Sequence, residues 1–127
     1  MTAEGIIDTS AALRSYYAIL LGGIDRYGEG GELIPLLAEN FTFDGPLAGQ
    51  VSGADRFARG VKGFIEAVRQ ITFIEAVATD DGAAVLYDAV LPSATVRFAE
   101  FFEFKDGIIK TIRLHYNAAD YLAAGGH

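Results

Sequence analysis

RFAEFFEFK at residues 97–105, the dipeptide Asp106-Gly107 and IIKTIRLHY at residues 108–116 together decide the fold of this chain. Side chains alternate between two faces along a β-strand. Asp-Gly between two apolar runs is a strong signal for a hairpin turn. The stretch therefore predicts two long antiparallel strands, over 95–105 and 108–116.

One acidic residue falls on the apolar face of the first of these strands. Phe98, Glu100 and Phe102 share one side, while Glu103 and Lys105 mark the other side as the one that faces solvent. Glu100 is therefore predicted to point into the interior. A buried carboxyl group must be paired, protonated or used. Two interpretations stay open: a functional group in a pocket, or a structural acid that is hydrogen-bonded to a tyrosine.

The composition excludes several classes of protein. The 127 residues, 51% of them hydrophobic, predict a single domain over residues 1–127. Without cysteine and with only two histidines, His115 and His127, no metal site is expected. The net charge of −7 argues against nucleic acid as a partner. No apolar run approaches the ~20 residues that span a bilayer, and no signal peptide is apparent, so we expect a cytoplasmic protein that does not bind membranes.

The rest of the chain divides into helical segments followed by strands. Apolar residues at helical spacing predict three helical segments, which begin near Ser10, at Glu32 and after Ser52. A short strand over 40–44 precedes the third segment, and strands over 71–79 and 83–91 follow it. Helices followed by consecutive hairpins predict an α+β fold, in which an antiparallel sheet carries the helices on one face.

Five phrases of the sequence carry a resemblance. They are YYAIL at 16–20, LLAENFTFDGP at 36–46, Ser52-Gly53 before a helix, the run over 98–107, and IRLHYN at 112–117. They resemble the SnoaL-like and ketosteroid-isomerase-like branch of the nuclear transport factor 2-like superfamily, over nearly the whole chain. The resemblance implies a strongly curved antiparallel sheet wrapped around the three N-terminal helical segments, as a cone with an apolar pocket. It also implies a homodimer that forms through the outer face of the sheet.

The resemblance also implies candidate catalytic residues. Isomerases of this branch use a tyrosine on the first helix, a carboxylate just before a proline, and an acid on a late strand. Tyr17 and Glu100 match the first and the third, which implies hydrogen bonds to a substrate carbonyl as it becomes an enolate. At the second position Gly45 precedes Pro46, and Asp44 lies one residue earlier, on the opposite face by strand alternation. Asp44 would reach the pocket only through a bulge at Gly45.

The implied pocket is apolar, so the expected ligand is a small hydrophobic molecule, and no cofactor is expected. No phosphate-binding glycine loop or nucleophile elbow occurs. The residues predicted to line the pocket are Tyr16, Phe43, Phe64, Phe98, Phe102, Ile112, Leu114 and Tyr116.

Three functions remain open at this point. The first is an isomerase or cyclase that moves a proton next to a carbonyl, with Tyr17 and Glu100 as the polar pair and Asp44 as the base. The second is a binding or regulatory protein for an apolar ligand, without chemistry of its own. The third is a dimerisation unit in which Phe101, on the outer face, anchors the interface.

Two further residues depend on the strand pairing. If Pro92-Ser93 is a two-residue turn, Asp88 and Arg97 oppose each other as an ion pair on the outer face. A longer loop would reverse the parity of Asp88 and send it into the pocket. His115 alternates with Leu114 and is predicted to lie on the outer face.

Overall fold

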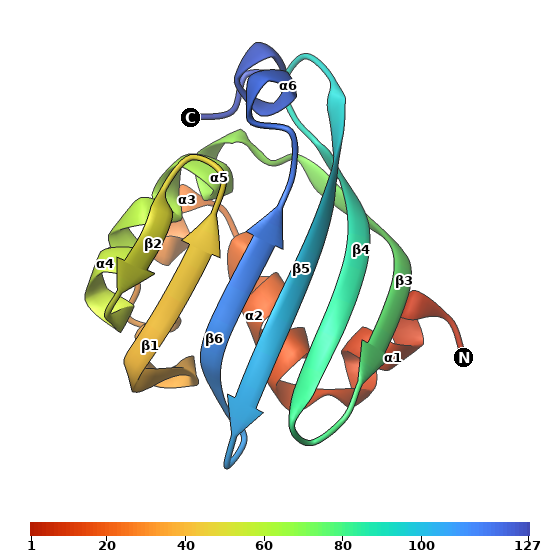
Figure 1. The fold of residues 1–127 in the computed structure, drawn as a ribbon. Coiled ribbons are helices and arrows are strands. Elements are labelled where there is room, and N and C mark those ends of the chain that lie inside the picture. The colour runs from red at the N-terminus through yellow and green to blue at the C-terminus, as the bar shows by residue number, and fades with distance from the viewer.

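The computed structural model describes residues 1–127, and its six strands form one sheet in the order β2-β1-β6-β5-β4-β3 (Figure 1). The helices are α1 (Ala3–Thr9), α2 (Ala11–Leu20), α3 (Ile24–Tyr27), the single 3-10 turn η1 (Ile34–Leu36), α4 (Ala54–Gly60), α5 (Lys62–Ala67) and α6 (Ala118–Ala123). The strands are β1 (Leu37–Gly45), β2 (Gly49–Ser52), β3 (Gln70–Ala78), β4 (Gly82–Val90), β5 (Thr95–Lys105) and β6 (Ile108–His115).

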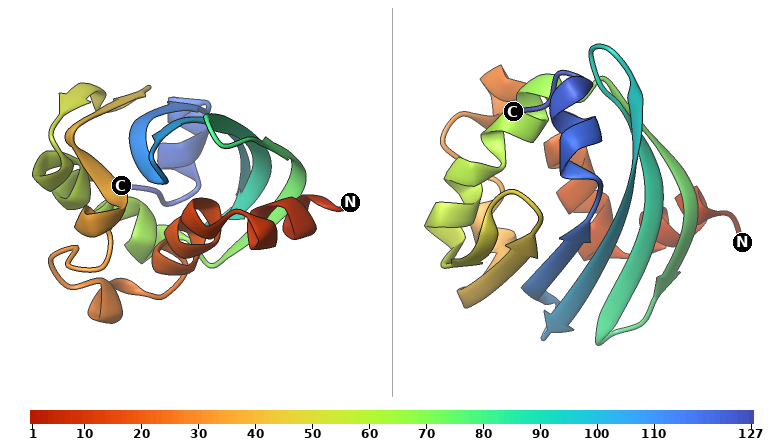
Figure 2. Two further views of the ribbon diagram at one scale, coloured as in Figure 1. Left: turned by 90° about the horizontal axis from the view of Figure 1, so that it is seen from below. Right: turned by 45° about the horizontal axis from the view of Figure 1, so that its top comes forward.

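The helices pack against one strongly curved, mostly antiparallel sheet, which confirms the predicted α+β fold class. All neighbouring strands are antiparallel except β1 and β6, which run parallel. Extra residues at Ile74 on β3 and Lys110 on β6 shift the register, and such bulges increase local bending and twist. Figure 2 shows the sheet as an arc with α1 and α2 on its concave side, and Figure 1 shows α6 across one end.

Strand β5 alternates between core and surface as its sequence predicts. Phe98 and Glu100 are each 1% exposed on the concave face, whereas Phe101 is 44% exposed on the outer face. The hairpin to β6 turns through Asp106 (φ 54°) and Gly107 (φ 78°). Two consecutive residues with positive φ are the geometry of a type I′ turn, the one that Asp-Gly favours. The predicted β5–β6 hairpin is confirmed.

Helix α2 brings two adjacent tyrosines to the concave face. The Ser10 side chain caps the helix by accepting a hydrogen bond from the Leu13 amide (3.4 Å). Tyr16 and Tyr17 are each 2% exposed, and their rings lie edge to face with centroids 5.2 Å apart. Both hydroxyls therefore lie over the middle of the sheet, where β5 passes.

The helix predicted to begin at Glu32 is wrong. One 3-10 turn, η1, replaces it, and β1 already begins at Leu37 because this residue pairs with Ile109 of β6. Pairing with a strand some seventy residues away outweighs local helix propensity here. The segment predicted as the third helix divides at Val61 into α4 and α5. Helices α1 and α6 were not among the predicted elements, and the first predicted helix is interrupted at Gly22-Gly23, which separates α2 from α3.

The hairpin between β4 and β5 has the predicted two-residue turn. The Leu91 amide donates to the Ala94 carbonyl (3.0 Å) around Pro92-Ser93. Arg97 then donates from Nε and Nη2 to the two carboxylate oxygens of Asp88, at 2.9 and 3.1 Å. This hydrogen-bonded pair lowers the pKa of Asp88.

His115 is exposed on the outer face, as predicted, with its ring 5.8 Å from that of Phe101. No helix in the structure combines the length and apolar character that crossing a membrane requires.

Candidate functional site

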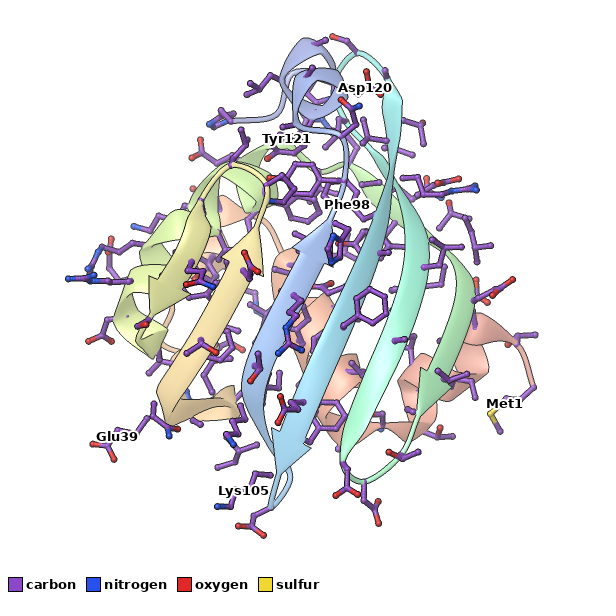
Figure 3. The ribbon with its side chains drawn as sticks, viewed as in Figure 1. Met1, Glu39, Phe98, Lys105, Asp120 and Tyr121 are labelled. Carbon is purple, nitrogen blue, oxygen red and sulfur yellow. The ribbon has the colours of Figure 1, made fainter.

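A cavity of about 290 Å³ lies between the concave face of the sheet, helices α4 and α5, and α6. Fourteen of its 18 lining residues are hydrophobic. Figure 3 shows Phe98 of β5 and Tyr121 of α6 at this end of the molecule, and their ring centroids are 6.0 Å apart. Ligand pockets usually enclose roughly 300–1,000 Å³, so the cavity suits a small, largely apolar molecule.

Glu100 lines this cavity from β5, which confirms the prediction that it faces the interior. The Tyr16 hydroxyl donates to its Oε2 atom (3.0 Å), and the Tyr17 hydroxyl donates to its Oε1 atom (2.8 Å). Each carboxylate oxygen keeps a further lone pair for another partner. No other Asp or Glu lines the cavity.

The pKa of Glu100 is raised from 4.5 to about 7. Burial is the largest cause, because it disfavours the charged carboxylate. The hydroxyls of Tyr17, Tyr16 and Tyr87 act in the opposite direction and lower this pKa. Near neutral pH the carboxyl group therefore populates both its protonated and its ionised form, as a group that accepts and returns a proton requires.

The tyrosines around Glu100 stay protonated. Burial, reinforced by the nearby Glu100 charge, raises the pKa of Tyr16, Tyr17 and Tyr87 well above its usual range. All three therefore keep an O–H group that can donate a hydrogen bond. Tyr17, however, does not line the cavity. Its ring packs edge-on against Phe73 (4.9 Å between centroids), and its hydroxyl reaches Glu100 from the core.

Asp44 does not reach the cavity, as strand alternation predicts, and the alternative in which a bulge at Gly45 turns it into the pocket is wrong. Its side chain is exposed and lies opposite Gln50 on β2 and Arg113 on β6. The register from Thr42 to Gly45 against β2 is continuous. Without a bulge, strand alternation holds Asp44 on the outer face.

Gly45 holds the position before Pro46, and the surrounding structure leaves no room there for an acidic side chain. Gly45 occupies a position on the same face as Phe43, and the Phe43 ring folds back over it. A Cβ atom added at Gly45 would lie 2.7 Å from Cζ of Phe43. The Phe43 ring therefore fills the space in which the resemblance places the carboxylate.

Six of the residues predicted to bind the ligand line the cavity, and two do not. Phe102 and Ile112 are buried, with 5% and 0% of their surface exposed, but lie in the packed core beyond it. The Phe102 ring packs edge-on against Tyr16, with centroids 5.4 Å apart. Aromatic rings fill the concave face beyond Glu100, so the cavity occupies only one end of it. The six are Tyr16, Phe43, Phe64, Phe98, Leu114 and Tyr116.

Several lining residues were missed from the sequence, above all Tyr87, Tyr121, Arg56 and His127. For Tyr87 the signal was present, because it alternates with Val85 and opposes Phe98 across the two-residue turn. Nothing in the sequence placed the α6 residue Tyr121 at the cavity. The structure contains no group of three or more His, Cys, Asp or Glu side chains that is suited to a metal ion.

Comparison with known families agrees with this architecture. A family model described as a SnoaL-like domain matches residues 25–112, well over half of the chain. The chain belongs to the SnoaL-like domain family. The resemblance to the SnoaL-like family is thereby confirmed.

Solved structures similar to this SnoaL-like protein share its fold. A steroid delta-isomerase from Pseudomonas aeruginosa matches with a TM-score of 0.69 and 18% identity, over 90% of this chain and 82% of that one. A protein with a ketosteroid isomerase-like fold from Catenulispora acidiphila, in complex with trimethylamine, matches with a TM-score of 0.69 and 16% identity, over 91% and 92%. A protein with a cystatin-like fold from Silicibacter pomeroyi matches with a TM-score of 0.72 and 12% identity, over 91% and 80%.

Identities this low establish the fold and leave the activity to the site itself. No curated protein matches the sequence at a significant level.

Proposed function

We propose that this SnoaL-like protein binds a small apolar carbonyl compound and transfers a proton at the carbon next to its carbonyl, in an isomerase-type or cyclase-type reaction. The observation that carries the proposal is Glu100, the one Asp or Glu side chain that lines an apolar cavity, with a pKa of about 7. A general base works best when its pKa lies near the operating pH.

The proposal gives Glu100 a different role from the one that the resemblance implies. The resemblance implied a neutral acid that donates a hydrogen bond while Asp44 acts as the base, but Asp44 lies outside the cavity. Glu100 is therefore the base. Its ionised form removes a proton from the α carbon, and the electron pair of the C–H bond moves toward the carbonyl oxygen. Protonated Glu100 then returns the proton to carbon, which restores the carboxylate.

The test measures proton transfer directly and needs no knowledge of the natural substrate. Cyclohexanone in heavy water exchanges its α protons for deuterium, and nuclear magnetic resonance follows the exchange. We expect the wild-type protein to catalyse this exchange and Glu100→Gln to lower the rate by about 10²–10⁴, the usual contribution of a general base. Glu103→Gln, on the same strand but on the outer face, is the matched control and should keep the wild-type rate.

The pH dependence gives an independent check on the same group. The exchange rate should rise as Glu100 ionises, with a midpoint near the pKa of about 7. Catalysed exchange that is unchanged in Glu100→Gln contradicts the proposal.

A second candidate function, binding without chemistry, is favoured by the surroundings of Glu100. Eight aromatic side chains line the cavity, and no ion pair of the structure includes this acid. Aromatic faces around a carboxylate attract organic ammonium ions through cation–π interaction, and the Catenulispora acidiphila protein was solved in complex with trimethylamine. Calorimetry can measure the binding of tetramethylammonium to the wild type and to Glu100→Gln. Binding that is lost in the variant, together with a ketone that binds but does not exchange its α protons, would favour this candidate over the isomerase.

A further inference from the structure

Four tyrosine side chains line the cavity, and the hydroxyl group of each has a neighbour in the protein. The hydroxyl of Tyr87 on β4 interacts with the Glu100 carboxyl group, but not as a hydrogen bond of good geometry. The other three are Tyr16, which donates to Glu100 Oε2 at 3.0 Å, Tyr121, which donates to the His127 carbonyl at 3.1 Å, and Tyr116, which lies by the backbone of Leu47.

The Tyr87 side chain is buried and held in place, with 1% of its surface exposed. Its ring stacks on that of Phe98 with centroids 5.3 Å apart and an interplanar angle of 6°. The Tyr17 ring meets it edge-on at 5.7 Å. Every fully buried side-chain nitrogen and oxygen in the structure has a hydrogen-bond partner. The Tyr87 hydroxyl has no hydrogen bond of good geometry, so its oxygen is not fully buried, and the residue borders the cavity beside Glu100.

The strand register places this hydroxyl group beside Glu100. Tyr87 pairs with Phe98 and Val85 pairs with Glu100, so Tyr87 is the diagonal neighbour of Glu100 on the same face. Diagonal neighbours lie within reach of aromatic and other long side chains. In keeping with this position, Tyr87 is one of the three hydroxyls that lower the pKa of Glu100. The remaining cavity tyrosines, Tyr116 and Tyr121, have no such effect.

We propose that Tyr87 donates the hydrogen bond that binds the substrate carbonyl oxygen, and that Tyr17 serves only to position Glu100. This assignment rests on the proposed function. It moves the donor role away from Tyr17, the tyrosine that matches the family pattern. The substrate is accordingly a ketone or enone whose oxygen reaches β4 while its α carbon faces Glu100.

The roles of the two residues balance within one step. Glu100 forms an O–H bond as the α C–H bond breaks, and the freed electron pair becomes a carbon–carbon double bond. The carbonyl π pair moves onto oxygen, whose developing negative charge the Tyr87 O–H group stabilises. Tyr87 keeps its own proton throughout, because burial raises its pKa well above its usual range.

The experiment reads the hydrogen bond separately from the chemistry. Infrared spectroscopy of bound cyclohexanone with an isotope-labelled carbonyl reports the C=O stretch, which falls when a donor binds the oxygen. In Tyr87→Phe the band should return to its value in hydrocarbon solvent, and α-proton exchange should fall by about 10²–10³, as when one oxyanion donor is removed. Tyr17→Phe should keep the lowered band while the pH midpoint of exchange moves upward, because a hydroxyl that lowers the pKa of Glu100 is lost.

Tyr27→Phe is the matched control. Its hydroxyl is buried and donates to the Ala58 carbonyl (2.6 Å), and its ring does not line the cavity, so band and exchange should stay as in wild type. A lowered C=O band that survives in Tyr87→Phe overturns the assignment.

The C=O band could be lowered in the wild type and not in Tyr87→Phe, while the wild type catalyses no α-proton exchange. That result would refute the proposed function but would support the hydrogen bond from Tyr87 to the carbonyl oxygen. If Tyr87→Phe does not fold, the infrared experiment is carried out with fluorotyrosine in place of Tyr87. Its more acidic hydroxyl should lower the band further, and an unchanged band overturns the assignment.

Discussion

Glu100 sits between Phe98 and Phe102 on the apolar face of β5, with 1% of its surface exposed. Two tyrosine hydroxyls meet its carboxylate oxygens, and these hydrogen bonds offset part of the cost of burying the charge. They do not offset all of it, since the pKa still rises to about 7. The same imbalance that makes this acid suited to proton transfer should also weaken the fold at alkaline pH.

The pH dependence of stability follows from the pKa of Glu100. The folded protein holds this proton with a pKa of about 7, against 4.5 for the ordinary group. Protonated Glu100 therefore contributes most to the free energy of unfolding below about pH 4.5. This contribution is lost as the pH rises through about 7. The loss is about 3 kcal/mol, at roughly 1.4 kcal/mol per pKa unit.

Urea unfolding near pH 5 and near pH 8 measures this loss. Glu100→Gln cannot ionise, so its stability should decline much less than that of the wild type between the two conditions. Parallel pH profiles of the two proteins would show that Glu100 is not the group responsible.

The β5–β6 hairpin shows how a local turn sets the parity of a whole strand. Asp106 and Gly107 both have positive φ, and this turn aligns Lys105 with Ile108. With that register, Phe98 and Glu100 face the cone and Phe101 faces outward. A residue with a Cβ atom tolerates positive φ poorly.

Alanine substitutions at two glycines distinguish the cost of positive φ from the cost of steric crowding. Gly107 and Gly31 both have open space around an added Cβ atom, but only Gly107 has a positive φ, of 78°. Gly107→Ala should lower the free energy of unfolding by about 1–2 kcal/mol. Gly31→Ala should be neutral or stabilising by up to about 1 kcal/mol. Chemical denaturation of both variants checks this, and equal losses at the two positions would argue against the turn geometry as the cause.

At the scale of the molecule, the outer face of the sheet exposes an apolar strip that runs across strands. Val77, Ala84 and Phe101 stand in one cross-strand row, with Val77 67% exposed and Phe101 44% exposed. Exposed apolar patches of this kind often mark interfaces. We propose that two copies of the chain associate through this face.

Sedimentation velocity tests the proposed homodimer. The wild type should sediment as a dimer and Phe101→Glu as a monomer, because a charge within the strip loses its solvation in the interface. Leu122→Glu, which changes a 52% exposed apolar residue on α6, should remain dimeric. A monomeric wild type, or a dimer that persists in Phe101→Glu, contradicts this interface.

Patterns within a few residues of one another predicted most of the architecture. Alternation along residues 97–105 placed Glu100 inside, and the chemistry of Asp106-Gly107 and Pro92-Ser93 predicted two turns together with the Asp88–Arg97 pair. These inferences succeed because strand parity and turn conformation depend on neighbouring residues. The segment after Glu32 failed for the opposite reason, since its strand depends on pairing with β6.

Tertiary packing alone decided which groups share the cavity. Neighbours in sequence, Tyr16 and Tyr17, differ because the first borders the cavity and the second is enclosed by rings from β3 and β4. Tyr87, 13 residues before Glu100, lies beside it through strand register, and Tyr121 borders the cavity from a helix that no local signal placed there. Space in a core is shared among segments distant in sequence, so no single stretch of the chain reveals where that space stays empty.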